Sequence, residues 1–402
     1  MKKYIFIIAV LFILVFHWIF SPYYLQDEET KEKNKIEEKI DSTVTVSFSS
    51  VGDIMCHSTQ FYYARVKKDS FDFKPVFSVI GNYLKSKDVL FGNLETVLAG
   101  NTHHYYGYPF FNSPNELAEA LKVAGFDFLF TANNHANDQG EKGVKRTIDE
   151  LRKNNIIPIG TNIIGTNTNG TKKFNEVTQK NIFVRKGIKF GVLAYTYGTN
   201  YNENALTPRN YVNYIDTVKI RKDITSLKNR NADLIIVYFH FGKEYIKQPT
   251  LYQKRIVEKT ISYGVDVILA SHPHIVQKFE KFKTNNGNLD SGFVTYSLGN
   301  FLSNQRWRYS DGGLIFNFDI TKNIFSDSVY VSNINYLPIW VFKGKVKGKK
   351  EYIILPSEDY NKPEQYSFTT KADIDSMKRS YFDTIELFTE GKQYPSPGKF
   401  SK

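Results

Sequence analysis

Five of the eight histidines in this chain lie at or just past the end of an apolar, strand-like run. They are His57, His135, His240, His272 and His274. The runs that precede them are 44–48, 126–130, 233–239 and 265–270. In α/β folds the carboxyl ends of parallel strands point into a shared crevice, where ligands bind. If these strands are neighbours, the histidines form one site, and this pattern favours a metal-dependent or acid–base site.

Strand-like and helix-like segments alternate from residue 43 onward. The predicted strands are 44–51, 89–91, 128–131, 189–196, 234–240, 267–271 and 292–298. The predicted helices are 75–85, 113–124, 140–154, 217–228 and 251–263. Alternation with connections of this length predicts an α/β fold with a largely parallel sheet.

The pattern changes after about residue 300. Segments 314–320 and 326–334 alternate polar and apolar residues like antiparallel strands. Segment 336–342 is a further strand candidate, and Pro338 within it predicts an edge position. A short strand at 352–355, an amphipathic helix at 370–389 and a loose polar tail complete the expected C-terminal extension, residues 346–402.

Composition limits the class of protein. A hydrophobic content of 41% is enough for a packed core, so global disorder is not expected. A formal charge of +12 favours an anionic partner, such as an acidic polymer, a lipid headgroup surface or nucleic acid. A lysine-rich composition without such a partner explains the charge equally well. The single cysteine, Cys56, excludes an intramolecular disulfide and is expected to be a buried filler rather than a nucleophile.

The N-terminus predicts a membrane anchor. Lys2 and Lys3 precede an almost wholly apolar segment, 4–20, of roughly the length that spans a bilayer as a helix. No small-residue cleavage site of the A-x-A type follows, so an uncleaved anchor at 1–24 is favoured over a cleaved signal peptide. The Glu- and Lys-rich segment 25–42 is expected to be a solvated stalk, and residues 43–345 the main domain, outside the cytoplasm.

The strand ends carry residue types that bind divalent metals. Carboxylates and amides follow the first strands, and imidazoles follow the later ones: Asp53, Asn93, Glu95, Asn134, His240, His272 and His274. His272 and His274 are two residues apart, so in an extended segment both point to the same side. Together these residues provide roughly the ligands of a two-metal phosphoesterase, whose ions lie about 4 Å apart. Each motif alone is weak, since His240 could be a satisfied core histidine and Asn134 could only shape a turn.

The order of the motifs resembles the bacterial capsule-synthesis family of the poly-γ-glutamate type (CapA/PgsA-like), related in fold to calcineurin-like metallophosphoesterases. The resemblance covers roughly residues 45–320, and its motifs are 52–55, 92–95, 132–140, 240–245, 271–274 and 297–301. It implies an α/β fold with a calcineurin-like β-sandwich flanked by helices. The anchored N-terminus and a β-rich C-terminal extension complete the expected architecture.

The resemblance also implies roles for individual residues. Asp53 and His274 would bind a first metal, Asn134, His240 and His272 would bind a second, and the segment of Asn93 and Glu95 stands where a bridging aspartate usually lies. His135 would be the general acid, and Asp138 and Glu244 are the further candidate catalytic acids. The ions would be Mn, Zn or Fe, one or two in number.

Two departures from the pattern leave the metal count open. Met55 replaces the histidine of the usual Asp-x-His motif, although His57 is near. Asn93 replaces the bridging aspartate, with Glu95 two residues on. Losing an anionic bridge weakens the attraction for two dications, so a single metal, or a site that binds without hydrolysing, remains an alternative.

The resulting functional hypothesis is a membrane-anchored protein of capsular poly-γ-glutamate synthesis or export, with a site that hydrolyses or transfers a phosphate or acyl-phosphate. Its expected partners are the anionic polymer, the membrane and other capsule-synthesis membrane subunits, and no nucleic acid. The alternative is a non-catalytic polymer-binding or export subunit on the same fold. A phosphoesterase-type nuclease fits the anchored N-terminus less well.

Overall fold

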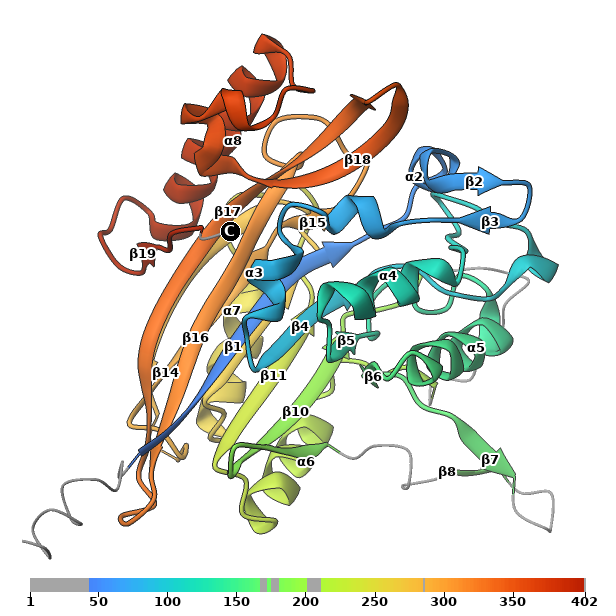
Figure 1. Ribbon diagram of the computed structural model, residues 1–402. Helices are drawn as coiled ribbons and strands as arrows, with labels where there is room; N and C mark the ends of the chain where they lie inside the picture. The colour runs from blue at the N-terminus through green and yellow to red at the C-terminus, as the bar shows by residue number, and fades with distance from the viewer. Residues whose placement is uncertain (1–42, 167–171, 175–180, 201–210, 285, 401–402) are drawn as a thin grey trace, which may run out of the picture. The chain divides into compact units, whose positions relative to one another are not determined.

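The protein contains two mixed β-sheets that share one core, as the computed structural model shows (Figure 1). It describes residues 43–166, 172–174, 181–200, 211–284 and 286–400. The first sheet has the order β18 (Lys349–Pro356), β17 (Val329–Val346), β16 (Gly312–Asn323), β1 (Thr43–Ile54), β4 (Val89–Leu94), β5 (Phe128–Phe130) and β6 (Ile157–Ile159). In addition, β15 (Asn300–Leu302) pairs with β1, and β19 (Ser396–Pro397) pairs with β17.

The second sheet has the order β13 (Val276–Lys283), β14 (Ser291–Leu298), β12 (Val267–Ser271), β11 (Leu234–His240), β10 (Ile188–Thr196) and β9 (Ile182–Arg185). Each sheet has a parallel part, formed by β1, β4, β5 and β6 in the first and by β10, β11, β12 and β14 in the second. Two short hairpins, β2–β3 (Arg65–Lys67, Ser70–Phe71) and β7–β8 (Ile164–Thr166, Lys172–Phe174), stand outside these sheets.

Aromatic side chains fill the space between the sheets. Phe48 of β1 meets Phe190 of β10 edge-on, with ring centroids 5.4 Å apart. Phe130 of β5 stacks on Tyr238 of β11 at 4.1 Å. All seven residues of β11 are buried, which explains why its sequence is apolar throughout rather than alternating. The two sheets therefore form a sandwich.

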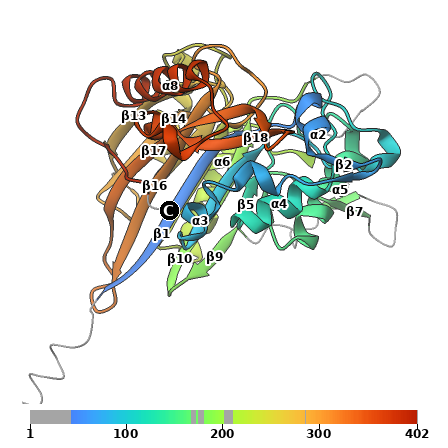
Figure 2. The ribbon, with the colours of Figure 1, turned by 45° about the horizontal axis from the view of Figure 1, so that its top comes forward.

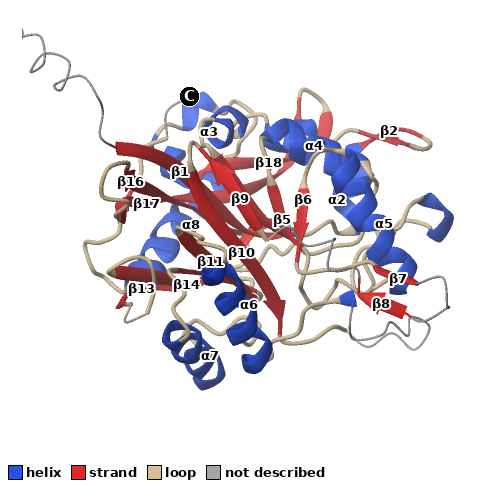
Figure 3. Ribbon diagram, turned by 90° about the horizontal axis from the view of Figure 1, so that it is seen from below, coloured by secondary structure: helices blue, strands red, loops and turns tan. Residues whose placement is uncertain are grey.

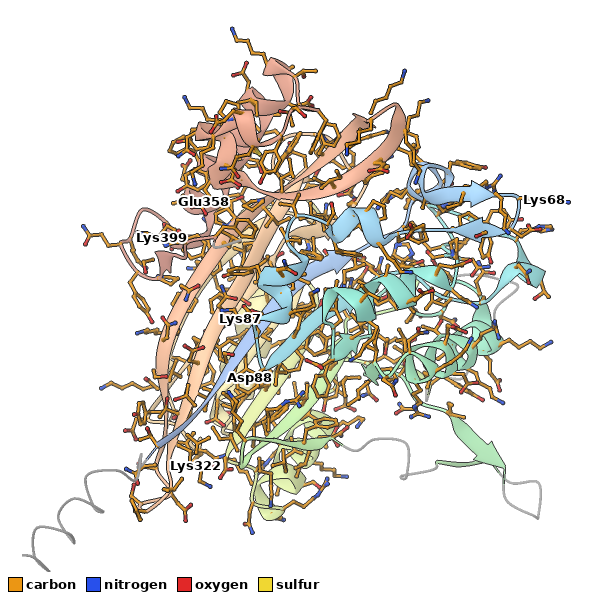
Figure 4. The ribbon with its side chains drawn as sticks, viewed as in Figure 1. Lys68, Lys87, Asp88, Lys322, Glu358 and Lys399 are labelled. Carbon is orange, nitrogen blue, oxygen red and sulfur yellow. The ribbon has the colours of Figure 1, made fainter. Side chains whose placement is uncertain are left out.

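Helices cover the two outer faces of this sandwich (Figure 3). The helices are α2 (Ser58–Ala64), α3 (Gly81–Lys85), α4 (Glu116–Ala124), α5 (Gly140–Lys153), α6 (Thr217–Asn229), α7 (Leu251–Ser262) and α8 (Lys371–Thr389), with 3₁₀ turns at Lys74–Phe77, Asn101–His103, Ser357–Asn361 and Pro363–Gln365. Apolar residues of α3 and α4 pack on the first sheet, and those of α6 and α7 pack on the second. Charged side chains such as Lys68 and Lys399 lie at the periphery (Figure 4).

The C-terminal helix α8 packs against both sheets (Figure 2). Its Phe388 contacts Phe279 of β13, with ring centroids 5.8 Å apart, and Tyr336 of β17 at 4.9 Å. The C-terminal extension was expected to start at residue 346, which is the last residue of β17. β17 pairs with β18 beyond this position, and β18 lies in the same sheet as β1.

Three expectations from the sequence were wrong. The strands form two mixed sheets rather than one largely parallel sheet, because strand pairing depends on tertiary packing that local patterns do not encode. Segment 75–85 forms a 3₁₀ turn and a short helix rather than one helix. Pro338 lies inside β17, between β16 and β18. It is tolerated there because pairing with β18 starts only at Ile339, so Pro338 stands at the end of that ladder.

The described residues within 45–322 and 328–400 form the compact unit that carries the site, and the described residues 43, 44 and 323–327 belong to a second, small unit. The anchor expected at 1–24 and the stalk expected at 25–42 lie outside the described residues. Within the part of the chain that the structure describes, no helix combines the length and apolar character that a membrane span requires.

Candidate metal centre

The carboxyl ends of the parallel strands from both sheets meet at one buried cluster. Asp53 and Asn93 are paired residues of β1 and β4, and His240 ends β11 beside Ser271 of β12. The predicted metal ligands are at most 3% exposed: Asp53, Asn93, Glu95, Asn134, His240, His272 and His274. The structure therefore brings together all seven residues that the strand-end pattern singled out.

Two groups of three ligand-type side chains overlap at Glu95. The first group is Asp53, Glu95 and His274, and the second is Glu95, His240 and His272. Within each group the candidate ligand atoms lie within 4.8 Å of one another. Glu95 Oε1 is 3.3 Å from His240 Nε2 and 3.8 Å from His274 Nε2, so one carboxylate faces both groups.

Burial sets the charge state of these groups. It raises the pKa of the Glu95 carboxyl well above its usual value, and the nearby Asp53 carboxylate adds to the effect. Burial lowers the pKa of His272 to about 3, and it lowers that of His240 well below its usual value. Both imidazoles are therefore neutral near pH 7, which is the form that binds metals.

The donor set fits a divalent metal. Glu95 Oε1 and His272 Nδ1 are buried and lack a hydrogen-bond partner among the residues described. Buried polar atoms normally have partners, so atoms left without one point to a missing ligand. The backbones of His272 and His274 adopt φ values of 107° and 58°, which residues other than glycine rarely take. Such strain is typical of residues that are held in place for function.

Three asparagines hold the carboxylates and imidazoles in place. Asn93 Nδ2 donates to Asp53 Oδ1 at 2.8 Å, and Asn93 Oδ1 accepts from Asn133 Nδ2 at 3.1 Å. Asn134 Oδ1 is 2.7 Å from His240 Nε2, at the edge of the second group. Asn93 is thus a neutral donor to Asp53, and Asn134, which the resemblance assigns to the second metal, contacts the second group through His240.

His135 lies beside this cluster and pairs with Asp138. The distance from His135 Nδ1 to Asp138 Oδ2 is 2.7 Å, and the backbone N–H of Phe111 donates to the same oxygen at 2.7 Å. Burial raises the pKa of the Asp138 carboxyl, while its hydrogen bond to His135 acts in the opposite direction. The Phe111 ring packs edge-on against the imidazole at 4.6 Å. These contacts fix the orientation of His135 through Nδ1 and one face of its ring.

Glu244 and His57 lie outside the two groups. Glu244 is exposed in the loop after β11, although its charge contributes to the raised pKa of Glu95 after burial and Asp53. His57 precedes α2, where it and Gln60 form a capping box, and burial lowers its pKa to about 4. The structure thus places Glu244 at the rim, and His57 serves the start of α2.

Three residues around the centre were not assigned to it from the sequence. Tyr197, which follows β10, packs against His272 with ring centroids 4.6 Å apart and the ring planes tilted by 44°. The Asn200 amide nitrogen is 3.2 Å from His135 Nδ1. Asn300 Oδ1 is 3.2 Å from His274 Nδ1, next to Gly299 with a φ of 70°. Of these three, only Asn300 had a signal in the sequence, because it lies in the motif 297–301 that carries part of the family resemblance.

Two curated relatives of this chain come from bacilli. The capsule biosynthesis protein CapA of Bacillus anthracis is 29% identical over 293 residues, which cover 70% of this chain and 64% of that protein. The PGA biosynthesis protein CapA of Bacillus subtilis (strain 168) is 25% identical over 331 residues, 80% of this chain and 78% of that protein. The chain thus spans slightly less than two thirds of the Bacillus anthracis relative.

Two solved structures show distant similarity. The NAD nucleotidase of Haemophilus influenzae is 14% identical with a TM-score of 0.45, over 85% of this chain and 62% of that one. A phosphatase from Mycoplasma pneumoniae is 16% identical with a TM-score of 0.42, over 74% of this chain and 94% of that one.

The family to which the chain belongs follows from residues 47–305. They match the model of the family described as bacterial capsule synthesis protein PGA_cap. The matched range includes every residue of the two ligand groups as well as His135 and Asp138. The chain is a member of this capsule synthesis family.

Proposed function

We propose that this protein acts in the synthesis or export of an anionic capsular polymer, with poly-γ-glutamate as the candidate. We further propose that its centre hydrolyses or transfers a phosphate or acyl-phosphate group. The observation that carries the enzymatic proposal is the pair of ligand groups joined by Glu95. A relative named for PGA biosynthesis and the net charge of +12 support the choice of polymer.

The two groups would hold one or two divalent ions. Imidazole and carboxylate donors suit Mn, Zn and Fe. Asp53 and His274 would hold the first ion, His240 and His272 the second, and Glu95 both. A bound ion would polarise a phosphoryl oxygen as a Lewis acid.

His135 would protonate the leaving oxygen. Its Nδ1 is engaged by Asp138 at 2.7 Å, so the proton to be donated would lie on Nε2. The Asp138 carboxylate would stabilise the imidazolium form before transfer. The Asn200 amide nitrogen lies 3.2 Å from Nδ1 and 3.5 Å from Nε2 of the same imidazole.

A non-catalytic polymer-binding subunit is the second candidate, and Met55 favours it. Met55 is buried two residues after Asp53, and its sulfur lies 3.8 Å from the Ser303 hydroxyl. A thioether there, in place of an imidazole, leaves the first group with one nitrogen ligand, His274. A weakly bound first ion would reduce catalysis without preventing polymer binding.

The decisive experiment combines metal analysis with turnover. Purified full-length protein is analysed for bound metal and then assayed on phosphate monoesters and diesters with added Mn²⁺ or Zn²⁺. His272→Ala is expected to lose metal and activity, whereas His57→Ala, a matched histidine outside both groups, is expected to keep both. A wild-type protein with neither metal nor activity would exclude the enzyme. Salt-sensitive binding to poly-γ-glutamate would then support the subunit role.

Membrane anchoring through residues 1–24 is part of the proposal. The apolar segment 4–20 and the preceding Lys2 and Lys3 support it. Fractionation of cells that express the full chain, compared with a chain starting at residue 25, tests it. Equal recovery of both in the soluble fraction would contradict anchoring.

A further inference from the structure

A row of five rings runs through the metal centre. Tyr197 lies 4.6 Å from His272, His272 lies 6.0 Å from His274, His274 lies 6.0 Å from Tyr245, and Tyr245 lies 5.3 Å from Trp307, all measured between ring centroids. The two candidate ligands are thus in the middle of the row. Tyr197 extends the row from His272, and Tyr245 and Trp307 extend it from His274, so aromatic residues of three different loops take part.

The ends of the row are open to solvent. Tyr197 is 44% exposed, Tyr245 41% and Trp307 51%, whereas His272 and His274 are 3% and 2% exposed. Single exposed aromatic residues are common on protein surfaces and need no explanation. Here the exposed rings contact two different histidines of a buried ligand cluster, so a molecule bound at the centre would lie next to them.

Backbone and side-chain contacts hold the rings in place. The backbone N–H of Tyr197 donates to the His240 carbonyl at 3.0 Å. The Tyr245 hydroxyl accepts from Gln305 Nε2 at 3.1 Å, and Trp307 follows Gln305 in the same loop. Rings that are already ordered lose little conformational entropy on binding, so they contribute more to affinity than mobile side chains do.

The geometry points to a substrate class. We infer that the centre takes a phosphate diester with an extended group on each side, one packing on Tyr197 and the other on Tyr245 and Trp307. A small monoester would contact only one end of the row and leave the other unused. Flat or methylene-rich groups are the chemistry that an open aromatic face favours. This inference rests on the proposed function, because it names the substrate of the same centre.

The test compares three monoanionic diesters that differ only in their rings. Dimethyl, methyl phenyl and diphenyl phosphate are titrated into the full-length protein with Mn²⁺ by calorimetry. Each phenyl ring is expected to tighten binding about 3- to 10-fold. Tyr197→Ala and Trp307→Ala are each expected to remove the gain of one ring. Tyr330→Ala, which removes a ring of similar exposure (47%) outside the row, is expected to change nothing.

Equal affinity for methyl phenyl and diphenyl phosphate would overturn the inference, as would an unchanged affinity ratio in both row variants. Bound Mn²⁺ and thermal unfolding, measured on each variant, show whether the centre is intact. The binding readout needs no turnover. Tighter binding of the diphenyl ester without hydrolysis of any ester would refute only the proposed reaction. Hydrolysis without tighter binding of the diphenyl ester would refute only the inferred substrate class.

Discussion

Replacing Gly52 with alanine tests how the strand that carries Asp53 is positioned. A Cβ added at Gly52 would lie 1.9 Å from the Gly299 carbonyl oxygen and 2.9 Å from its carbon. Both are backbone atoms, so no side-chain rotation relieves the overlap. Asp53 N–H donates to the same oxygen at 2.9 Å, and Asn300, which contacts His274, follows directly. The substitution must therefore separate β1 from this turn.

The expected cost follows from two effects. Forcing an extra carbon into a closely packed site costs about 1–3 kcal/mol. Weakening the hydrogen bond from Asp53 adds about 0.5–1.5 kcal/mol. A total of about 2–4 kcal/mol corresponds to a fall in Tm of about 3–5 °C for a folded chain of this size.

Thermal unfolding and Mn²⁺ titration of Gly52→Ala provide the assay. Affinity for Mn²⁺ should fall as well, because Asp53 moves relative to His274. Gly81→Ala is the matched control, since no atom lies within 4 Å of the added Cβ. It should leave stability unchanged or raise it by up to about 1 kcal/mol, because alanine favours a helix more than glycine does. A Tm for Gly52→Ala within about 1 °C of the wild type, with unchanged Mn²⁺ affinity, would refute the reasoning.

Three further predictions concern charge. Mn²⁺ at 100 times its Kd should stabilise the wild type by about 2.7 kcal/mol in thermal unfolding, and Glu95→Gln should abolish this gain, because both ligand groups lose their shared carboxylate. His135→Ala should lower kcat by about 10²–10⁴-fold while bound metal stays constant, and unchanged turnover would exclude it as the general acid. Burial raises the pKa of Asp266 to about 6 despite three backbone N–H donors, so the folded state holds this proton more tightly than the unfolded state, whose pKa is near 3.8. The contribution of Asp266 to the free energy of unfolding should therefore fall by about 3 kcal/mol as pH rises from about 4 to 6, and stay constant above pH 6. Urea unfolding of Asp266→Asn should lack this fall. A pH dependence identical to that of the wild type would contradict the raised pKa of Asp266.

The proximity of the candidate metal ligands could be predicted because strand ends are recognisable from local sequence patterns. The apolar run 234–240 is the strand β11, and its last residue, His240, faces the cluster. His272 and His274 follow β12 in the same way. The carboxyl ends of parallel strands meet at a shared crevice, and polar residues directly after such strands lie there. Their proximity could therefore be expected before the strand order was known.

Other features depend on contacts between distant segments. Strand order is one, since β15 pairs with β1 across nearly 250 residues of chain. Tyr197 is another, because it follows β10 in a loop whose sequence carries no strand or helix pattern, and only packing places it on His272. No local pattern in a single sequence encodes such contacts.

Asn93 illustrates how a departure from a family pattern can be compensated within one strand. Its amide nitrogen lies 2.8 Å from Asp53 Oδ1 and 3.5 Å from Glu95 Oε2, and all three residues are fully buried. An aspartate at this position would place a third carboxylate among them, and buried like charges raise one another's pKa until a proton is retained. An amide avoids this repulsion and donates a hydrogen bond instead.

Glu95 offers a carboxylate two residues further along. Side chains two apart in an extended segment point to the same side, so Glu95 can reach the cluster that Asn93 faces. Its longer side chain brings Oε1 to 3.3 Å from His240 Nε2 and 3.8 Å from His274 Nε2. In the proposed centre the anionic bridge has therefore moved by two positions rather than disappeared. Asn93 therefore does not by itself argue against two ions; the feature that weakens binding of the first ion is the single imidazole, His274, in the first group.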